Sequence, residues 1–148
     1  MKFQHILLFT IVIFISCNEK KEKPKTVAIG ANKEIMQTPL ARSIENGAEV
    51  YQNFCTQCHR PNGKGIGRSY PPLKGSDWLT SKRLESIKAV KYGLNGEIVV
   101  NDKTYDNIMQ PMGLSNEEVA DVLNFIMNSW GNTQDKMVTT DEVSSVEK

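Results

Sequence analysis

The sequence predicts a small all-α domain of three to four helices with one small β-hairpin. The chain has 148 residues, 39% of them apolar and 24% charged, so it has room for one small globular domain. Apolar residues recur at three- and four-residue spacing in three segments, which is the period of an amphipathic helix. No alternation of strands and helices, which would predict a parallel sheet, is visible.

The first predicted helix begins at Ala41 and ends at Cys55. Its apolar face is expected to consist of Ile44, Gly47, Val50, Tyr51 and Phe54. A second helix is predicted over residues 82–92, with Ser81 as N-cap and Gly93 as its stop. The residues of this helix that are expected to point inward are Leu84, Ile87 and Val90.

The third predicted helix, residues 116–129, has the clearest start signal. Ser115 and Glu118 form an S-x-x-E capping box ahead of an apolar stripe. Between the second and third helices, residues 98–105 predict a small hairpin that turns at Asn101-Asp102.

The N-terminal end predicts export from the cytoplasm. Residues 1–16 resemble a secretory signal, because their apolar run is too short to span a bilayer. The run stops at Ser16-Cys17, a pattern typical of bacterial lipoproteins, so Cys17 is expected to carry the lipid that anchors the mature chain to a membrane. An uncleaved anchor, or secretion without Cys17, stays open. The protein is expected in the cell envelope, on the periplasmic side.

Two segments are predicted to lie outside the domain, which is expected to span residues 41–131. Residues 17–40 are polar and charged, which predicts a flexible tether behind the lipid. Residues 132–148 lack apolar periodicity and are expected to form a disordered tail.

The segment Cys55-Thr56-Gln57-Cys58-His59 is a C-x-x-C-H motif, the pattern of covalent haem attachment. Two thiols on one helical turn can bind haem through thioether bonds, while His59 supplies an iron ligand. A thioredoxin-like pair would need a βαβ context, and a structural zinc site would need further Cys or His ligands. The only other histidine is His5, in the signal segment, and the third cysteine is Cys17. The sequence therefore predicts one haem c bound to Cys55 and Cys58.

The sixth iron ligand is expected to be a methionine, because the mature chain has no second histidine. A thioether is a soft ligand that raises the reduction potential of haem iron. Met109 and Met112 both lie ahead of the third helix, and the choice between them stays open at this point.

These residues resemble the class I cytochrome c family over residues 41–132. That family has a glycine eight residues and an aromatic four residues before the first haem cysteine, and Gly47 and Tyr51 match both. Its P-x-L-x-G element is matched by residues 71–75. The resemblance implies a cytochrome c-like fold around the haem, and it implies that the Pro71 carbonyl accepts the ring N–H of His59.

The resemblance also implies further haem contacts. It puts Met109 in the ligand position, with Met112 as the alternative, and suggests Arg68 and Trp78 as contacts of the haem propionates. The sequence departs from the family at two positions: Gln110 separates Met109 from a proline, and Arg60 stands where a glycine often follows the motif histidine.

The expected function is electron transfer rather than catalysis. A haem whose two axial positions are filled by protein side chains does not readily bind a substrate at iron, so the protein is expected to carry single electrons between redox partner proteins. A formal net charge of +1 gives no reason to expect nucleic acid as a partner. Two alternatives keep the haem: a gas-binding domain with a labile sixth ligand, and an electron-entry subunit of a membrane oxidoreductase complex.

Overall fold

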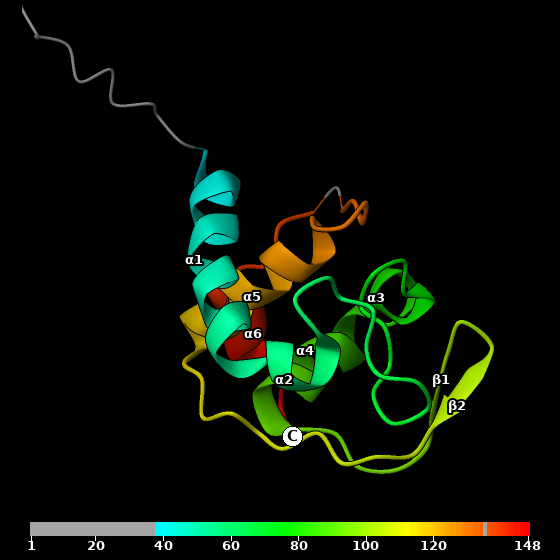
Figure 1. Ribbon diagram of the computed structural model, residues 1–148. Coiled ribbons are helices and arrows are strands. Elements are labelled where there is room, and N and C mark those ends of the chain that lie inside the picture. Colours follow the sequence, from blue (N-terminus) through cyan, green and yellow to red (C-terminus); the bar gives the residue numbers. More distant parts are fainter. Residues whose placement is uncertain (1–37, 135) are drawn as a thin grey trace, which may run out of the picture. The chain divides into compact units, whose positions relative to one another are not determined.

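The structure is a computed structural model that describes residues 38–134 and 136–148 (Figure 1). The signal segment, Cys17 and nearly all of the predicted tether lie outside the described residues. The elements follow in the order α1 (Pro39–Phe54), α2 (Thr56–His59), α3 (Asp77–Ser81), α4 (Arg83–Tyr92), β1 (Ile98–Val100), β2 (Lys103–Tyr105), α5 (Asn116–Met127) and α6 (Thr140–Ser145). Within residues 38–134 and 136–148, no helix is long and apolar enough to cross a bilayer.

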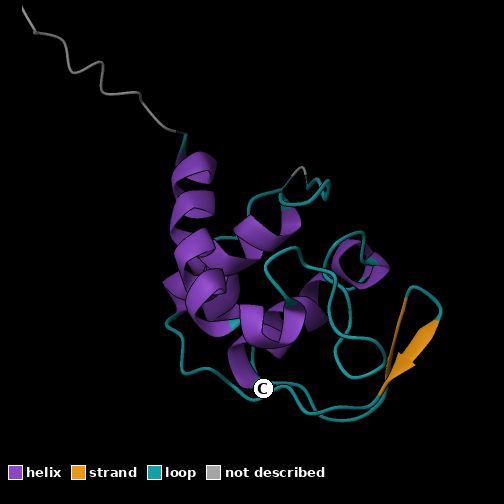
Figure 2. Cartoon of the chain, viewed as in Figure 1, coloured by secondary structure: helices purple, strands orange, loops and turns teal. Residues whose placement is uncertain are grey.

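The predicted fold class is confirmed. Figure 2 shows a fold made mostly of helices, with the two strands joined in one small antiparallel hairpin. The described part of the chain has six helices, not three to four. The helices that the sequence did not predict are short, and a helix of four to six residues is too short to show an apolar period.

Helices α1 and α5 pack closely against each other at Gly47. A Cβ atom at this position would overlap the backbone carbonyl of Asp121 and would lie 2.9 Å from the Cβ of Phe125. Only glycine therefore lets the two helices approach this closely. The start of α1 is set by Thr38, whose hydroxyl accepts a hydrogen bond of 3.1 Å from the N–H of Ala41.

The predicted capping box at the start of α5 is confirmed. The Ser115 hydroxyl accepts from the Glu118 N–H at 3.2 Å, and the Glu118 carboxylate accepts from the Ser115 N–H at 2.8 Å. The core is centred on the inner face of this helix, where the most buried apolar residues are Val119, Val122, Leu123, Ile126 and Met127.

Helix α4 begins one residue later than predicted, and the prediction that Leu84 points inward is wrong. The buried residues of α4 are Ser86, Ile87 and Ala89, and Leu84 lies roughly 150° around the helix from their mean direction. Leu84 is 53% exposed as a result.

The predicted hairpin and its turn are confirmed. Ile98 pairs with Tyr105 and Val100 with Lys103. Asn101 and Asp102 have φ of 51° and 59°, so both lie in the left-handed region that a two-residue type I′ turn requires. Asn and Asp tolerate this region better than most residues.

The predicted disordered tail is wrong for the described residues. Residues 136–148, which we call the C-terminal strap, contain α6 and contribute Val138, Val143 and Val146 to the core. Val138 is held by the buried side chain of Asn124, which accepts from its N–H at 2.8 Å and donates to its carbonyl at 2.9 Å. The domain therefore continues beyond residue 131.

Candidate haem-binding site

The C-x-x-C-H motif forms a single helical turn directly after α1. Cys55 is both the C-cap of α1 and the N-cap of α2, and its carbonyl accepts a hydrogen bond of 2.9 Å from the N–H of His59. Cys55 and Cys58 are both half-buried free thiols. Burial, with a smaller contribution from the nearby Cys58, raises the pKa of the Cys55 thiol to about 11. The two sulfur atoms and the imidazole are thus presented from one turn of chain.

The imidazole of His59 is buried and oriented by Pro71. Its Nδ1 lies 3.0 Å from the Pro71 carbonyl oxygen, which can only accept, so Nδ1 carries the hydrogen and Nε2 is left free to bind a metal. Burial lowers the pKa of His59, although the hydrogen bond to Pro71 opposes this shift. His59 is therefore held as a neutral ligand near pH 7.

A tightly hydrogen-bonded loop, residues 60–75, places Pro71 beside His59. The N–H of Gly65 donates to the His59 carbonyl at 3.0 Å, and the Gly63 carbonyl accepts from the N–H groups of Leu73 and Lys74. A Cβ at Gly65 would lie 2.6 Å from the Pro71 carbonyl oxygen, so only glycine fits against this acceptor. The sequence analysis did not identify Gly65, because its role depends on a contact within the loop.

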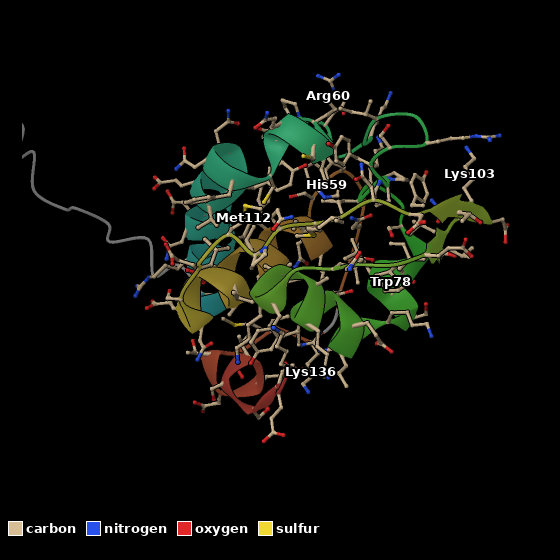
Figure 3. All side chains as sticks on the ribbon, turned by 90° about the horizontal axis from the view of Figure 1, so that it is seen from below. His59, Arg60, Trp78, Lys103, Met112 and Lys136 are labelled. Atoms are coloured by element: carbon tan, nitrogen blue, oxygen red, sulfur yellow. The ribbon has the colours of Figure 1, made fainter. Side chains whose placement is uncertain are left out.

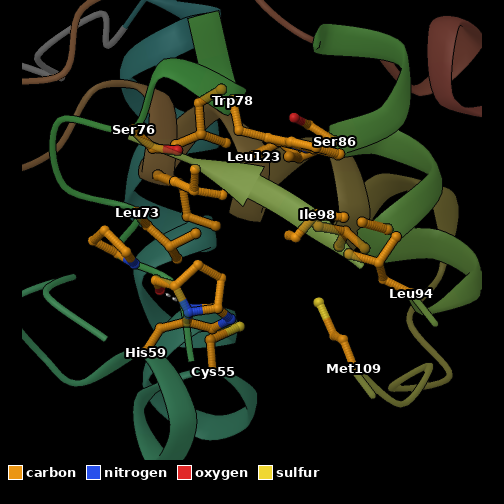
Figure 4. A pocket seen from close by; sticks show the side chains of 17 residues that line it. Cys55, His59, Leu73, Ser76, Trp78, Ser86, Leu94, Ile98, Met109 and Leu123 are labelled. Atoms are coloured by element: carbon orange, nitrogen blue, oxygen red, sulfur yellow. Dashed lines mark hydrogen bonds between the residues drawn. The ribbon is translucent and has the colours of Figure 1, made fainter. Parts of the chain in front are cut away.

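A deep cavity opens next to Cys55 and His59 (Figure 4). It is partly open to solvent. Its walls are largely apolar side chains from α3, α4, α5, the hairpin and the 60–75 loop, and include Leu73, Leu79, Val90, Ile98, Leu123 and Ile126. Such walls suit a large, flat, apolar ring.

Met109 lies on the wall of the deep cavity opposite His59 (Figure 4). Its backbone is fixed by Leu94: the Leu94 N–H donates to the Met109 carbonyl at 2.9 Å, and the Met109 N–H donates to the Leu94 carbonyl at 2.8 Å. The preceding Gly93, with φ of 80°, makes room for this pairing, because a Cβ there would lie 2.5 Å from the Met109 carbonyl oxygen. The sequence analysis read Gly93 only as a helix stop and did not identify Leu94.

The other predicted site residues are Met112, Trp78 and Arg68, and they differ in whether they line the deep cavity. Met112 is half-buried and lines an adjoining hollow, together with Phe54 and Cys58, but it does not line the deep cavity. Trp78 is half-buried and lines the deep cavity. Arg68 is exposed and lines neither hollow.

The residues on these walls fit a covalently bound haem. Two free thiols on one turn suit the two thioether bonds of haem c, a neutral imidazole with a free Nε2 suits one axial position, and the facing wall offers a thioether. Within the described ranges, no cluster of three or more His, Cys, Asp or Glu side chains could hold a metal ion instead.

The comparisons with known proteins agree with a covalently bound haem. The family model of cytochrome c matches residues 44–130. Cytochrome c-552 of Thermus thermophilus is 35% identical over 116 residues, which are 72% of this chain and 78% of the relative.

Other relatives are subunits of larger proteins. The cytochrome c subunit of a quinone alcohol dehydrogenase of Gluconacetobacter polyoxogenes is 32% identical over 104 residues, covering 68% of this chain but 22% of the subunit. The CcoP subunit of a cbb3-type cytochrome c oxidase of Rhodobacter capsulatus is 26% identical over 128 residues, covering 82% of this chain and 41% of the subunit. Since the family model covers more than half of the chain and includes the C-x-x-C-H turn, the protein is an electron-transfer member of the cytochrome c family and carries one covalently bound haem c.

Proposed function

We propose that this protein is a single-electron carrier whose haem iron is held by His59 and Met109, and that it works as a membrane-tethered shuttle between extracytoplasmic redox partners. Bound haem c supplies an iron that alternates between the ferrous and ferric states. The observation that carries the proposal is the position of Met109, on the cavity wall opposite His59.

Two features of the chain support Met109 over Met112 as the ligand. Met109 lines both the deep cavity and the adjoining hollow, whereas Met112 lines only the adjoining hollow. The backbone of Met109 is also fixed by two hydrogen bonds to Leu94. A methionine whose backbone is already fixed loses less conformational entropy on binding iron.

A carrier of this kind needs a ligand set that changes little between oxidation states. Nδ1 of His59 is held by Pro71 and the Met109 backbone by Leu94, so both ligands are positioned by contacts that do not involve the haem. The apolar walls exclude water from the iron and favour the form with the lower charge. Both iron positions are then filled by protein, which leaves little room for substrate chemistry or gas binding at the metal.

The ligand assignment is tested with Met109→Ala and, as its matched control, Met112→Ala. Ferric haem with a thioether ligand has a weak long-wavelength charge-transfer band. This band is expected to disappear in Met109→Ala and to remain in Met112→Ala. The reverse result would assign the iron to Met112, and carbon monoxide binding to the unaltered ferrous protein would favour the gas-binding alternative.

The tether is proposed from residues 1–40, where Cys17 follows an apolar run. Cys17→Ser is expected to release the protein from the membrane fraction while the haem spectrum stays unchanged. If the altered protein still sediments with membranes, then the lipid on Cys17 is not the anchor.

A second candidate role is electron entry into a membrane oxidoreductase. Its support is that relatives such as the alcohol dehydrogenase subunit contain a matching region within a longer chain. Mild extraction of membranes distinguishes the two roles, because a subunit co-purifies stoichiometrically with its complex, whereas a shuttle elutes alone.

A further inference from the structure

The C-terminal strap, residues 136–148, ends beside the loop that carries Met109. Figure 1 marks the C-terminus close to the end of α4 and to the segment that precedes α5. Lys148 lines the same surface hollow as Gly93, Leu94, Met109 and Pro111. The last residues of the chain are therefore neighbours of the proposed iron ligand.

Three hydrogen bonds join the strap to the last turn of α4. The ammonium group of Lys91 donates to the carbonyls of Val143 at 2.8 Å and Val146 at 3.0 Å. The Tyr92 hydroxyl donates to the Val146 carbonyl at 2.9 Å. All three are partly buried, and two have a charged donor, which strengthens them.

Only Gly93 separates this anchored turn from the residue that holds Met109. Leu94 exchanges two backbone hydrogen bonds with Met109. A continuous path of contacts thus leads from the strap to Met109. It runs through the hydrogen bond of Tyr92, along the backbone from Tyr92 to Leu94, and through the hydrogen bonds between Leu94 and Met109. A displacement of the end of α4 would be transmitted directly to the Met109 backbone.

The strap has a second anchor at the opposite end of α4. Releasing this anchor tests whether the strap affects the position of Met109 or only the stability of the whole protein. Arg83 donates to both carboxylate oxygens of Glu142, each at 2.7 Å, and to the carbonyls of Lys136 and Met137. Arg83 is the first residue of α4 and Tyr92 the last, so both anchors tie the strap to the same helix. Only the anchor at Lys91 and Tyr92 adjoins Leu94.

We propose that the C-terminal strap is a positioning element of the haem site: by holding Lys91 and Tyr92, it fixes Leu94 and thereby keeps Met109 at the iron. This inference rests on the proposed role of Met109 as the sixth ligand. It assigns a redox function to the segment that the sequence analysis expected to be disordered.

The test compares Lys91→Met, Tyr92→Phe and the double variant with the unaltered holoprotein. Two readouts are used: amide hydrogen exchange at Leu94 and Met109, and the affinity of the ferric protein for added imidazole, which must displace the thioether. In the double variant we expect exchange at both amides to be about tenfold faster and imidazole to bind about tenfold more tightly, the factor that corresponds to losing one to two net hydrogen bonds. Tyr92→Phe alone should give a smaller change in the same direction.

Arg83→Met is the matched control, because it releases the other anchor of the same strap. It should lower the free energy of unfolding while leaving the Met109 amide and the imidazole affinity unchanged. If Arg83→Met and the double variant change the two readouts equally, or if neither changes the imidazole affinity, the strap is only a general stabiliser and the proposal is overturned.

A different variant tests whether Met109 is the iron ligand at all. If Met109→Ala has the same spectrum and imidazole affinity as the unaltered protein, then Met109 is not the iron ligand. The proposed positioning role of the strap is then overturned as well. A changed spectrum in Met109→Ala together with no effect in the Lys91 and Tyr92 variants would overturn the positioning role alone.

Discussion

The hydroxyl of Tyr51 donates a hydrogen bond of 2.7 Å to the carbonyl oxygen of Arg60. Arg60 has φ of 66° and ψ of 154°, a conformation that is almost restricted to glycine and that costs other residues roughly 1–3 kcal/mol. The Gly63 N–H donates to the same carbonyl at 3.0 Å. Two hydrogen bonds therefore hold a strained residue in place directly after His59, and the exposed side chain of Arg60 points away from the fold (Figure 3).

Replacing Arg60 by glycine is expected to stabilise the protein. Glycine adopts this conformation without a steric penalty, but it also loses more backbone entropy on folding, so the expected gain in the free energy of unfolding is about 1 kcal/mol. Urea denaturation of the holoprotein measures it. Arg60→Ala is the control: it removes the same charged side chain but keeps a Cβ, so it should give no comparable gain. Equal effects of the two substitutions would contradict the strain argument.

Tyr51→Phe is expected to cost about 1 kcal/mol at neutral pH, because the hydrogen bond to Arg60 is lost. It should also change the dependence of stability on alkaline pH. Burial raises the pKa of Tyr51 in the folded protein well above the usual value near 10. The contribution of the neutral phenol is then fully present below about pH 10 and is lost as the pH rises further. Unfolding free energies from pH 8 to 11 should fall less steeply in Tyr51→Phe, and parallel curves would contradict the prediction.

The predictable parts of the fold depend on residues close together in the sequence. Ser115 and Glu118 are three residues apart, and Asn101 and Asp102 alone determine the hairpin turn, so local physics was sufficient for both. The haem motif is equally local. Pro71, twelve residues from His59, was accessible only through the family resemblance.

The parts that the sequence did not predict depend on distant polar contacts with backbone groups. Asn124 holds the strap through the N–H and carbonyl of Val138, and Arg83 holds it partly through the carbonyls of Lys136 and Met137. Such backbone groups leave no pattern in the side chains. The same is true of Leu94 and Met109, whose pairing is made entirely by backbone atoms. Sequence periodicity reports which side chains are buried, and it carries no information about such pairings.

Asn124→Ala is expected to destabilise the protein by about 3 kcal/mol. The buried side chain bonds to the N–H and the carbonyl of Val138 and donates to the Ser43 hydroxyl at 2.8 Å, so its removal leaves buried polar groups without partners. Asn128→Ala serves as the control, because Asn128 is less buried and donates one hydrogen bond, to the Asn124 carbonyl. Urea denaturation should show a clearly smaller loss for the control, and similar losses would mean that Val138 is not held by Asn124.

The Arg83–Glu142 ion pair is expected to weaken in acid. The hydrogen bonds from Arg83 are the largest cause of the lowered pKa of Glu142 in the folded protein. A lowered pKa gives a contribution that is present above the unfolded value near 4.5 and is lost as the pH falls through the folded value. The unfolding free energy of Glu142→Gln should therefore differ most from that of the unaltered protein at pH 6 to 7, and the two should converge as the pH falls through the folded value. A difference that is independent of pH would show that the charge of Glu142 is not involved.

Gly93→Ala is expected to displace Met109 from the iron. A Cβ at this position would lie 2.5 Å from the Met109 carbonyl oxygen and 2.9 Å from Cδ of Pro111, both of which belong to the loop that carries the ligand. The loop must move to relieve these contacts, so the charge-transfer band should weaken and the reduction potential should fall, since loss of the thioether removes the ligand that raises it. Visible absorption and redox titration measure the two effects.

Gly96→Ala separates this steric effect from backbone strain. Gly96 also has a positive φ, 100°, but a Cβ there would have no atom within 4 Å. Alanine at residue 96 should therefore lower stability through backbone strain alone, while the band and the potential stay as in the unaltered protein. If both substitutions shift the potential equally, the position of Met109 depends on the general stability of the loop rather than on its close contact with Gly93.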